Sequence, residues 1–90
     1  MRIAITDEFR KICEDIIKEN KSQDEWAMIE SDDMFQAKSY CGGYDADEAA
    51  FCFSYYDDNN IEYWLQVNLE EVKKIANKEV NTLGACPRIS

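Results

Sequence analysis

The sequence predicts an α+β fold in which an antiparallel sheet of three to four strands has two helices packed on one of its faces. Apolar residues recur at helical spacing near both ends of the chain. Two aromatic-rich segments in the middle alternate between apolar and polar residues, and a turn rich in Asp and Asn joins them. The 90 residues suffice for a single domain, residues 1–90, with the element order α-β-β-β-β-α.

The first helix is expected to begin after Thr6, which is a candidate N-cap followed by the acidic pair Asp7-Glu8 in the first turn. Residues 1–5 are apolar enough to form a short strand or to pack over this helix. We expect the helix to end at about Asn20 or Lys21. Its apolar stripe, in which the cysteine is interpreted as a small core residue, consists of Phe9, Ile12, Cys13, Ile16 and Ile17.

The next segments are predicted to be two strands separated by tight turns. Residues 25–31 are interpreted as a strand, although a continuation of helix also fits, and Ser31-Asp32-Asp33 as a turn. Residues 34–41 form the second expected strand. It should stop at Gly42-Gly43, a pair that usually interrupts regular structure, and residues 44–48 should form a loop.

The central hairpin is predicted from strict alternation in residues 49–56 and 61–67, joined by Asp57-Asp58-Asn59-Asn60. One set of alternating residues should face the core: Phe51, Phe53, Tyr55, Ile61, Tyr63, Leu65 and Val67. The opposite set should face solvent or a partner, because both helices cover the same side: Ala50, Cys52, Ser54, Tyr56, Glu62, Trp64 and Gln66.

The second helix is expected to start at Asn68, an N-cap that can form a capping box with Glu71. Its apolar stripe consists of Leu69, Val72, Ile75, Ala76 and Val80. Residues 81–90 are expected to be irregular, because Gly84 and Pro87 both oppose continuation of the helix.

Negative charge is concentrated in the middle of the chain. The formal net charge is −9, and residues 22–72 contain thirteen acids against one base, Lys38. Three acidic groups fall in predicted turns: Asp32-Asp33, Asp45 to Glu48, and Asp57-Asp58. The first and third of these turns should share one edge of a four-stranded meander. Such a rim repels nucleic acid and attracts basic protein surfaces. The alternative is that the acids only favour turns and keep the protein soluble.

Several function classes are excluded or left without support. The chain has no histidine, which rules out Ser-His-Asp and Cys-His catalysis, and its four cysteines lack the close pairs of a zinc site. The segments that begin at Asp45 and Asp58 resemble calcium loops only at their start, because Ala50 and Tyr63 stand where glycine is needed. We therefore predict no enzyme activity, no metal and no cofactor.

A cytoplasmic location is expected, because charged residues come too early for a signal peptide and no apolar run is long enough to span a membrane. The cysteines should then be reduced, although their even number leaves a disulfide open.

The charge distribution predicts a module that binds a basic protein rather than nucleic acid. The most concrete form is an inhibitor that occupies a nucleic-acid-binding surface, as a nuclease immunity protein, an anti-restriction protein or an anti-CRISPR protein does. The alternative is a small structural or regulatory homodimeric subunit joined through Cys52, Tyr56 and Trp64. The expected partner-binding residues are Asp32, Asp33, Asp45, Asp47, Glu48, Asp57, Asp58, Glu62, Tyr56 and Trp64.

Overall fold

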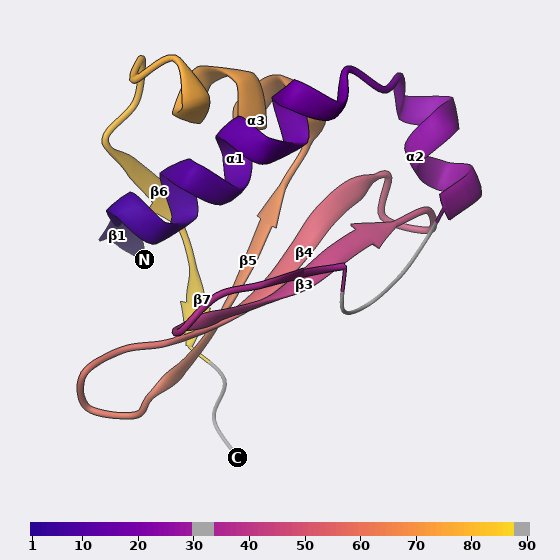
Figure 1. Cartoon of the computed structure of the whole chain (residues 1–90). Helices are drawn as coiled ribbons and strands as arrows, with labels where there is room; N and C mark the ends of the chain where they lie inside the picture. The colour runs from indigo at the N-terminus through magenta and orange to yellow at the C-terminus, as the bar shows by residue number, and fades with distance from the viewer. Residues whose placement is uncertain (30–33, 88–90) are drawn as a thin grey trace.

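The computed structural model describes residues 1–29 and 34–87, and within them the chain forms an α+β fold (Figure 1). The elements, in chain order, are β1 (Arg2–Ala4), α1 (Asp7–Glu19), α2 (Gln23–Ile29), β2 (Phe35–Gln36), β3 (Tyr40–Asp45), β4 (Ala50–Tyr56), β5 (Glu62–Val67), α3 (Leu69–Ala76), β6 (Thr82–Gly84) and β7 (Cys86–Pro87). The α+β class is confirmed. The expected order α-β-β-β-β-α, with two helices and three to four strands, is only roughly compatible with this arrangement, because the described residues form three helices and a five-stranded main sheet.

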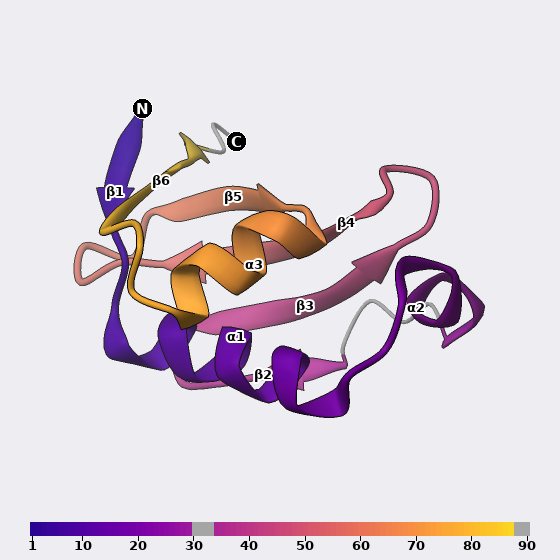
Figure 2. The ribbon, with the colours of Figure 1, turned by 90° about the horizontal axis from the view of Figure 1, so that it is seen from above.

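The main sheet is antiparallel and has five strands in the order β2-β3-β4-β5-β7, while β1 and β6 form a separate pair. Helices α1 and α3 lie side by side over one face of the main sheet, and α2 lies near the end where β3 turns into β4 (Figure 2). The prediction that helices cover one face is therefore confirmed for α1 and α3.

Aromatic side chains build the core between this sheet face and the helices. Phe9 of α1 stacks on Tyr40 with ring centroids 5.2 Å apart and meets the edge of Phe53 at the same distance. Trp26 of α2 meets Phe51 edge-on at 5.2 Å. The predicted core set of the central hairpin is buried at Phe51, Phe53, Tyr63, Leu65 and Val67. Tyr55 is only half-buried, and Ile61 lies outside β5 and is exposed.

The helix ends match the sequence signals. The Thr6 side chain accepts a hydrogen bond from the Phe9 backbone N–H, and α1 ends at Glu19 with Asn20 as a left-handed cap (φ 53°). At α3, the predicted capping box between Asn68 and Glu71 is present in both directions. These motifs act locally and need no tertiary partner, so the sequence alone was sufficient to locate them.

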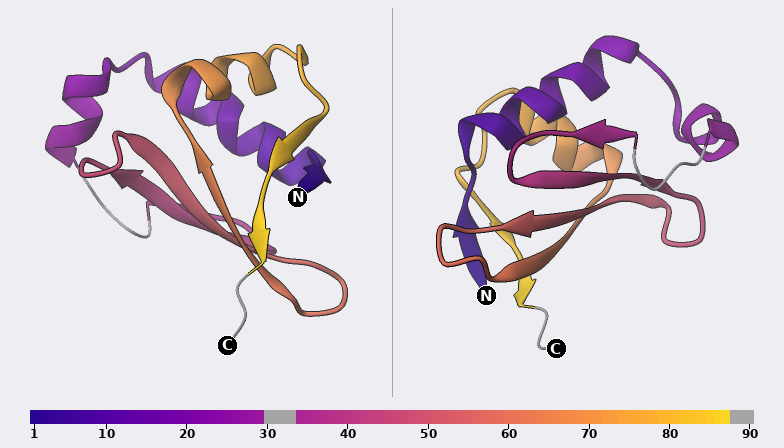
Figure 3. Two further views of the ribbon diagram at one scale, coloured as in Figure 1. Left: turned by 180° about the vertical axis from the view of Figure 1, so that it is seen from behind. Right: turned by 60° about the horizontal axis from the view of Figure 1, so that its bottom comes forward.

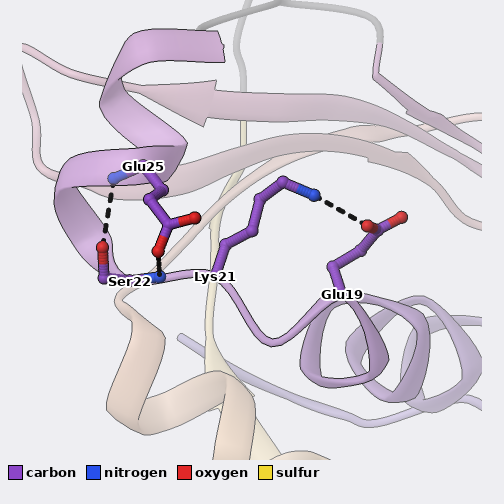
Figure 4. A network of polar contacts seen from close by, with 4 residues as sticks. All are labelled: Glu19, Lys21, Ser22 and Glu25. Atoms are coloured by element: carbon purple, nitrogen blue, oxygen red, sulfur yellow. Dashed lines mark hydrogen bonds and ion pairs between the residues drawn. The ribbon is translucent and has the colours of Figure 1, made fainter.

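The segment expected as a strand at residues 25–31 is helical over its described part. The Ser22 hydroxyl accepts from the Glu25 N–H, and the Glu25 carboxylate accepts from the Ser22 N–H, at 3.2 Å each (Figure 4). This is a second capping box, which starts α2 after Ser22. The same view shows Lys21 paired with Glu19 at 2.7 Å in the short link between α1 and α2.

The expected strand 34–41 is two strands, β2 and β3, joined by a tight turn in which the Ala37 N–H donates to the Tyr40 carbonyl. Gly42 and Gly43 lie inside β3 instead of ending a strand. A Cβ atom on Gly42 would lie 2.1 Å from the Cys52 carbonyl oxygen and 2.8 Å from the Phe53 Cα. Glycine is needed here because β3 and β4 approach closely, and not because the chain turns.

Over its described part, residues 81–87, the C-terminal segment is not irregular as expected, and residues 88–90 lie outside the described residues. β6 pairs with β1, with Ile3 opposite Leu83, so the strand alternative for residues 1–5 is the correct one. β7 adds to the edge of β5, with Cys86 opposite Trp64. Gly84 and Pro87 oppose a helix but not a short edge strand, where proline is tolerated because no further strand needs its N–H. Among the described helices, none is long and apolar enough to cross a lipid bilayer.

Candidate protein-binding surface

The side of the main sheet that faces away from α1 and α3 is the candidate functional surface. Figure 3 shows it turned toward the viewer in the right-hand panel, with no described helix across it. We call this side the open face and define it by the outward residues of β3, β4 and β5: Cys41, Gly43, Asp45, Cys52, Ser54, Tyr56, Glu62, Trp64 and Gln66.

The register of the sheet sets the order of these residues across the open face. Cys41 lies opposite Ser54, Ser54 opposite Trp64, and Trp64 opposite Cys86. Gly43, Cys52 and Gln66 form the next row. Because most of these side chains are small, a groove of about 760 Å³ runs along the face. Trp64 and Cys86 line one side of it, and Asp45 and Glu48 line it at the β3–β4 turn.

Three of the predicted acids come together at the β3–β4 turn. The Asp45 carboxylate accepts hydrogen bonds from the backbone N–H groups of Asp47 (2.9 Å) and Glu48 (3.4 Å), which fixes the turn. The Glu48 carboxylate in turn accepts from the Gln66 side-chain amide of β5 at 3.4 Å. This contact holds the Glu48 carboxylate against the strand that carries Trp64.

The other acids of the predicted site that the structure describes, Asp57, Asp58 and Glu62, lie at the opposite end of the open face. Asp57 accepts from the backbone N–H groups of Asn59 and Ile61, each at 2.9 Å, so it has a structural role in the β4–β5 turn. Asp58 is exposed beside it, and Glu62 is half-buried opposite Tyr56. Seven residues of β4 separate the two turns, which at about 3.3 Å per residue places the two acidic groups on the order of 20 Å apart.

The electrostatic effect of both acidic turns reaches into the sheet. Burial, together with the carboxylates of Asp45 and Glu48, raises the pKa of the Cys52 thiol above its usual range. At the other end, burial together with Asp57 and the neighbouring Asp58 raises the pKa of Tyr55. Residues 40–67 contain six acids and no lysine or arginine. The surface built by this segment therefore carries negative charge at both of its ends.

The predicted site residues are thus only partly brought together. Trp64 and Tyr56 lie on the open face with exposed fractions of 55% and 46%, between the two acidic turns. Asp32 and Asp33 lie outside the described residues. The prediction that they share an edge with Asp57-Asp58 depended on a strand at residues 25–31, and that segment is α2.

Sequence reasoning missed the contribution of the C-terminal residues to this surface. Gly84 and Cys86 line the groove because β6 and β7 bring them there. The available signal was the alternation of Leu83 and Ala85, both buried, with Gly84 and Cys86, both exposed.

The cysteines and carboxylates are the described groups that could carry chemistry. All four cysteines are thiols. Burial raises the pKa of Cys13 to about 12, which keeps this core thiol protonated and unreactive at neutral pH. Within residues 1–29 and 34–87, no group of Cys, Asp and Glu side chains is placed to hold a metal ion. Comparisons of the chain with protein-family models, with curated proteins and with solved structures gave no match.

Proposed function

We propose that this protein is a small acidic binding module whose open face docks on a basic surface of another protein. In its most concrete form it is an inhibitor that occupies a nucleic-acid-binding site, as nuclease immunity, anti-restriction and anti-CRISPR proteins do. One observation carries the proposal. Six acids and no base lie in residues 40–67, gathered at the two ends of one open face, with Trp64 and Tyr56 exposed on the same face.

The spacing of the charges suits a surface that normally holds a phosphate backbone. A separation of about 20 Å corresponds to roughly six nucleotide steps at about 3.4 Å per step. Direct binding of nucleic acid is disfavoured, since such surfaces need lysine and arginine to neutralise phosphates. The negative field would instead attract a basic partner over a distance of about a Debye length, so association should be fast and sensitive to salt.

The exposed aromatic residues supply the short-range part of the interaction. Trp and Tyr are common anchors of protein interfaces, where burial of their rings excludes water around nearby charged groups. Trp64 is the larger anchor and lies in the middle row of the sheet, opposite Ser54 and Cys86. Steric occlusion by this face, together with charge attraction at its two ends, would be the mechanism of inhibition.

The test is capture from a native cell extract at low and high salt, with the captured proteins identified and assayed for nuclease activity. The variant Asp45→Asn/Asp47→Asn/Glu48→Gln removes three charges and keeps the acceptor oxygens that fix the turn. The matched control Glu14→Gln/Asp15→Asn/Glu79→Gln removes three exposed charges outside residues 40–67. We expect wild type and control to capture and inhibit a basic nucleic-acid-binding protein, and the turn variant to lose it. Equal capture by all three proteins, unaffected by salt, would refute the proposal.

The second candidate is a homodimer joined through the open face, and the exposure of Trp64 and Tyr56 favours it. However, both ends of this face are acidic, so pairing two copies would bring like charges together. Molar mass measured across a salt series separates the candidates. A dimer of this kind should strengthen as salt screens the repulsion, whereas the binding module should stay monomeric.

A further inference from the structure

We propose that the groove on the open face is a receptor for an arginine side chain that projects from the basic partner, with the guanidinium stacked on Trp64 and paired with Glu48. This inference rests on the proposed function and names the chemical group that the surface recognises. It is carried by the groove itself, by the exposed indole beside it and by the fixed carboxylate at its end.

The groove is large enough to admit a long side chain, and its lining leaves the middle of the open face uncovered. Its volume of about 760 Å³ falls in the range of roughly 300–1,000 Å³ typical of sites that hold small molecules. Gly43, Cys52 and Ser54 form the floor and leave the space above them open. The indole of Trp64, 55% exposed, lies directly across the β4–β5 pair from Ser54. A planar group entering over the floor would therefore meet an aromatic surface.

The charge of the groove selects a cation. Its lining, as far as the structure describes it, contains the carboxylates of Asp45 and Glu48 and no lysine or arginine. Glu48 accepts from Gln66 through Oε2, so Oε1 is left to accept from a ligand. The raised pKa of Cys52, to which both carboxylates contribute, shows that their field reaches the floor. A phosphate or carboxylate ligand would be repelled at this position.

Arginine fits this arrangement better than lysine does. Its guanidinium is planar, stacks on aromatic rings and donates two parallel hydrogen bonds to a carboxylate, whereas the lysine ammonium is a compact and strongly hydrated charge. Arginine is also the residue that basic surfaces use to grip phosphates in a bidentate manner. A module that sequesters such an arginine would remove a phosphate-binding group from its partner as well as block access.

Trp64 provides a direct readout in the intact protein. The chain has two tryptophans, and Trp26 is 2% exposed, so the indole N–H resonance of Trp64 reports on the groove separately from that of the buried indole. The probes are the blocked peptides Gly-Arg-Gly, Gly-Lys-Gly and Gly-citrulline-Gly. Citrulline keeps the shape of arginine without its charge.

We expect the arginine peptide to bind with a millimolar Kd and to shift the resonances of Trp64, Gly43 and Ser54. The lysine peptide should bind about tenfold more weakly, and the citrulline peptide should not bind measurably. The substitutions Trp64→Leu and Glu48→Gln should each weaken arginine binding about tenfold. The control Glu14→Gln/Asp15→Asn should bind as wild type does, because its two changed residues are exposed on α1.

Two results would overturn the inference: equal binding of the arginine and lysine peptides, or shifts confined to the acidic turns with Trp64 unaffected. Either result would show that the acidic turns attract any positive charge and that the groove does not recognise arginine specifically. The proposed function is judged separately, by partner capture. If capture needs the acids of the β3–β4 turn but tolerates Trp64→Leu, the receptor fails and the function stands. If the arginine peptide binds as expected but the acids do not affect capture, the function fails and the receptor stands.

Discussion

The two faces of the hairpin β4–β5 are built from alternating residues of the same strands, yet they differ in almost every physical property. On the covered face, Phe51 and Leu65 are at most 2% exposed and are packed against the helices. On the open face, Trp64 is 55% exposed and its neighbours are polar or small. Burial of large apolar side chains dominates folding stability. The comparison therefore assigns stability to the covered face and leaves the open face available for the proposed recognition.

The sharpest test of this division compares two aromatic truncations on the same hairpin. Phe51 meets Trp26 at 5.2 Å and Tyr44 at 5.0 Å between ring centroids, so Phe51→Ala should lower the free energy of unfolding by about 3–5 kcal/mol. Trp64→Ala should lower it by only about 1–2 kcal/mol, because slightly more than half of this side chain is exposed. Urea denaturation measures both. A similar cost for the two substitutions would contradict the assignment.

The close approach of β3 to β4 should be the next most sensitive feature. Gly42→Ala would force its Cβ against the Cys52 carbonyl oxygen, so the strands must separate, and we expect a loss of about 1–3 kcal/mol. The matched control is Gly84→Ala, because a Cβ at Gly84 meets nothing within 4 Å. This control should be neutral or slightly stabilising. If both variants unfold at the same urea concentration, the inferred tight contact is absent.

Local signals in the sequence predicted the structure where the chain determines its own conformation. The helix caps at Thr6 and Asn68, and the alternation of the central hairpin, required no knowledge of distant contacts. The capping box of α2 is equally local, because Ser22 and Glu25 stand three residues apart, as the motif requires. This motif predicts the start of α2, the helix that was expected to be a strand.

Tertiary contacts decided the segments that local signals could not place. Gly42 is required by a neighbouring strand, which no spacing in its own segment indicates. β6 and β7 exist because β1 and β5 offer edges, and those partners lie far away in the chain. The candidate site shows the same division. The acidic turns of the hairpin followed from the sequence, whereas the groove required the placement of Gly84 and Cys86 by those late strands.

A thiol in the core and a thiol on the open face should respond differently to alkaline pH. Cys13 is fully buried, and its pKa is about 12 in the folded state against an ordinary value of 9.0. The folded state holds this proton more tightly than the unfolded state does. The stabilisation that comes from the protonated thiol is therefore fully present below pH 9 and is lost as pH rises from 9 to 12. Stability should then fall by about 1.4 kcal/mol per pH unit from this group.

The control for the alkaline effect is Cys13→Ala, which should be less stable at neutral pH but should lose less stability on going from pH 9 to 10. Burial also raises the pKa of Tyr40 to about 12, and both proteins share this contribution apart from the small part that the charge of Cys13 adds, so the difference in slope reports mainly on Cys13. Replacing the open-face thiol, Cys52→Ala, should change the slope less. Parallel curves for wild type and Cys13→Ala would show that this thiol is not protected from ionisation.

The smallest expected effect separates stability from recognition within a single turn. Ala49 has a left-handed backbone (φ 52°) at the end of the β3–β4 turn, directly after Glu48. A Cβ is unfavourable in this region and glycine has none, so Ala49→Gly should stabilise the fold by about 0.5 kcal/mol, even after the entropy that glycine adds to the unfolded chain. Asn60, also left-handed (φ 62°), should gain less from Asn60→Gly, because asparagine tolerates this conformation.

Since Ala49→Gly leaves the Glu48 carboxylate and Trp64 in place, arginine-peptide affinity should not change while the urea midpoint rises. A rise in stability coupled to a loss of affinity would mean that strain in this turn positions Glu48, and that the two faces are not independent at their shared end.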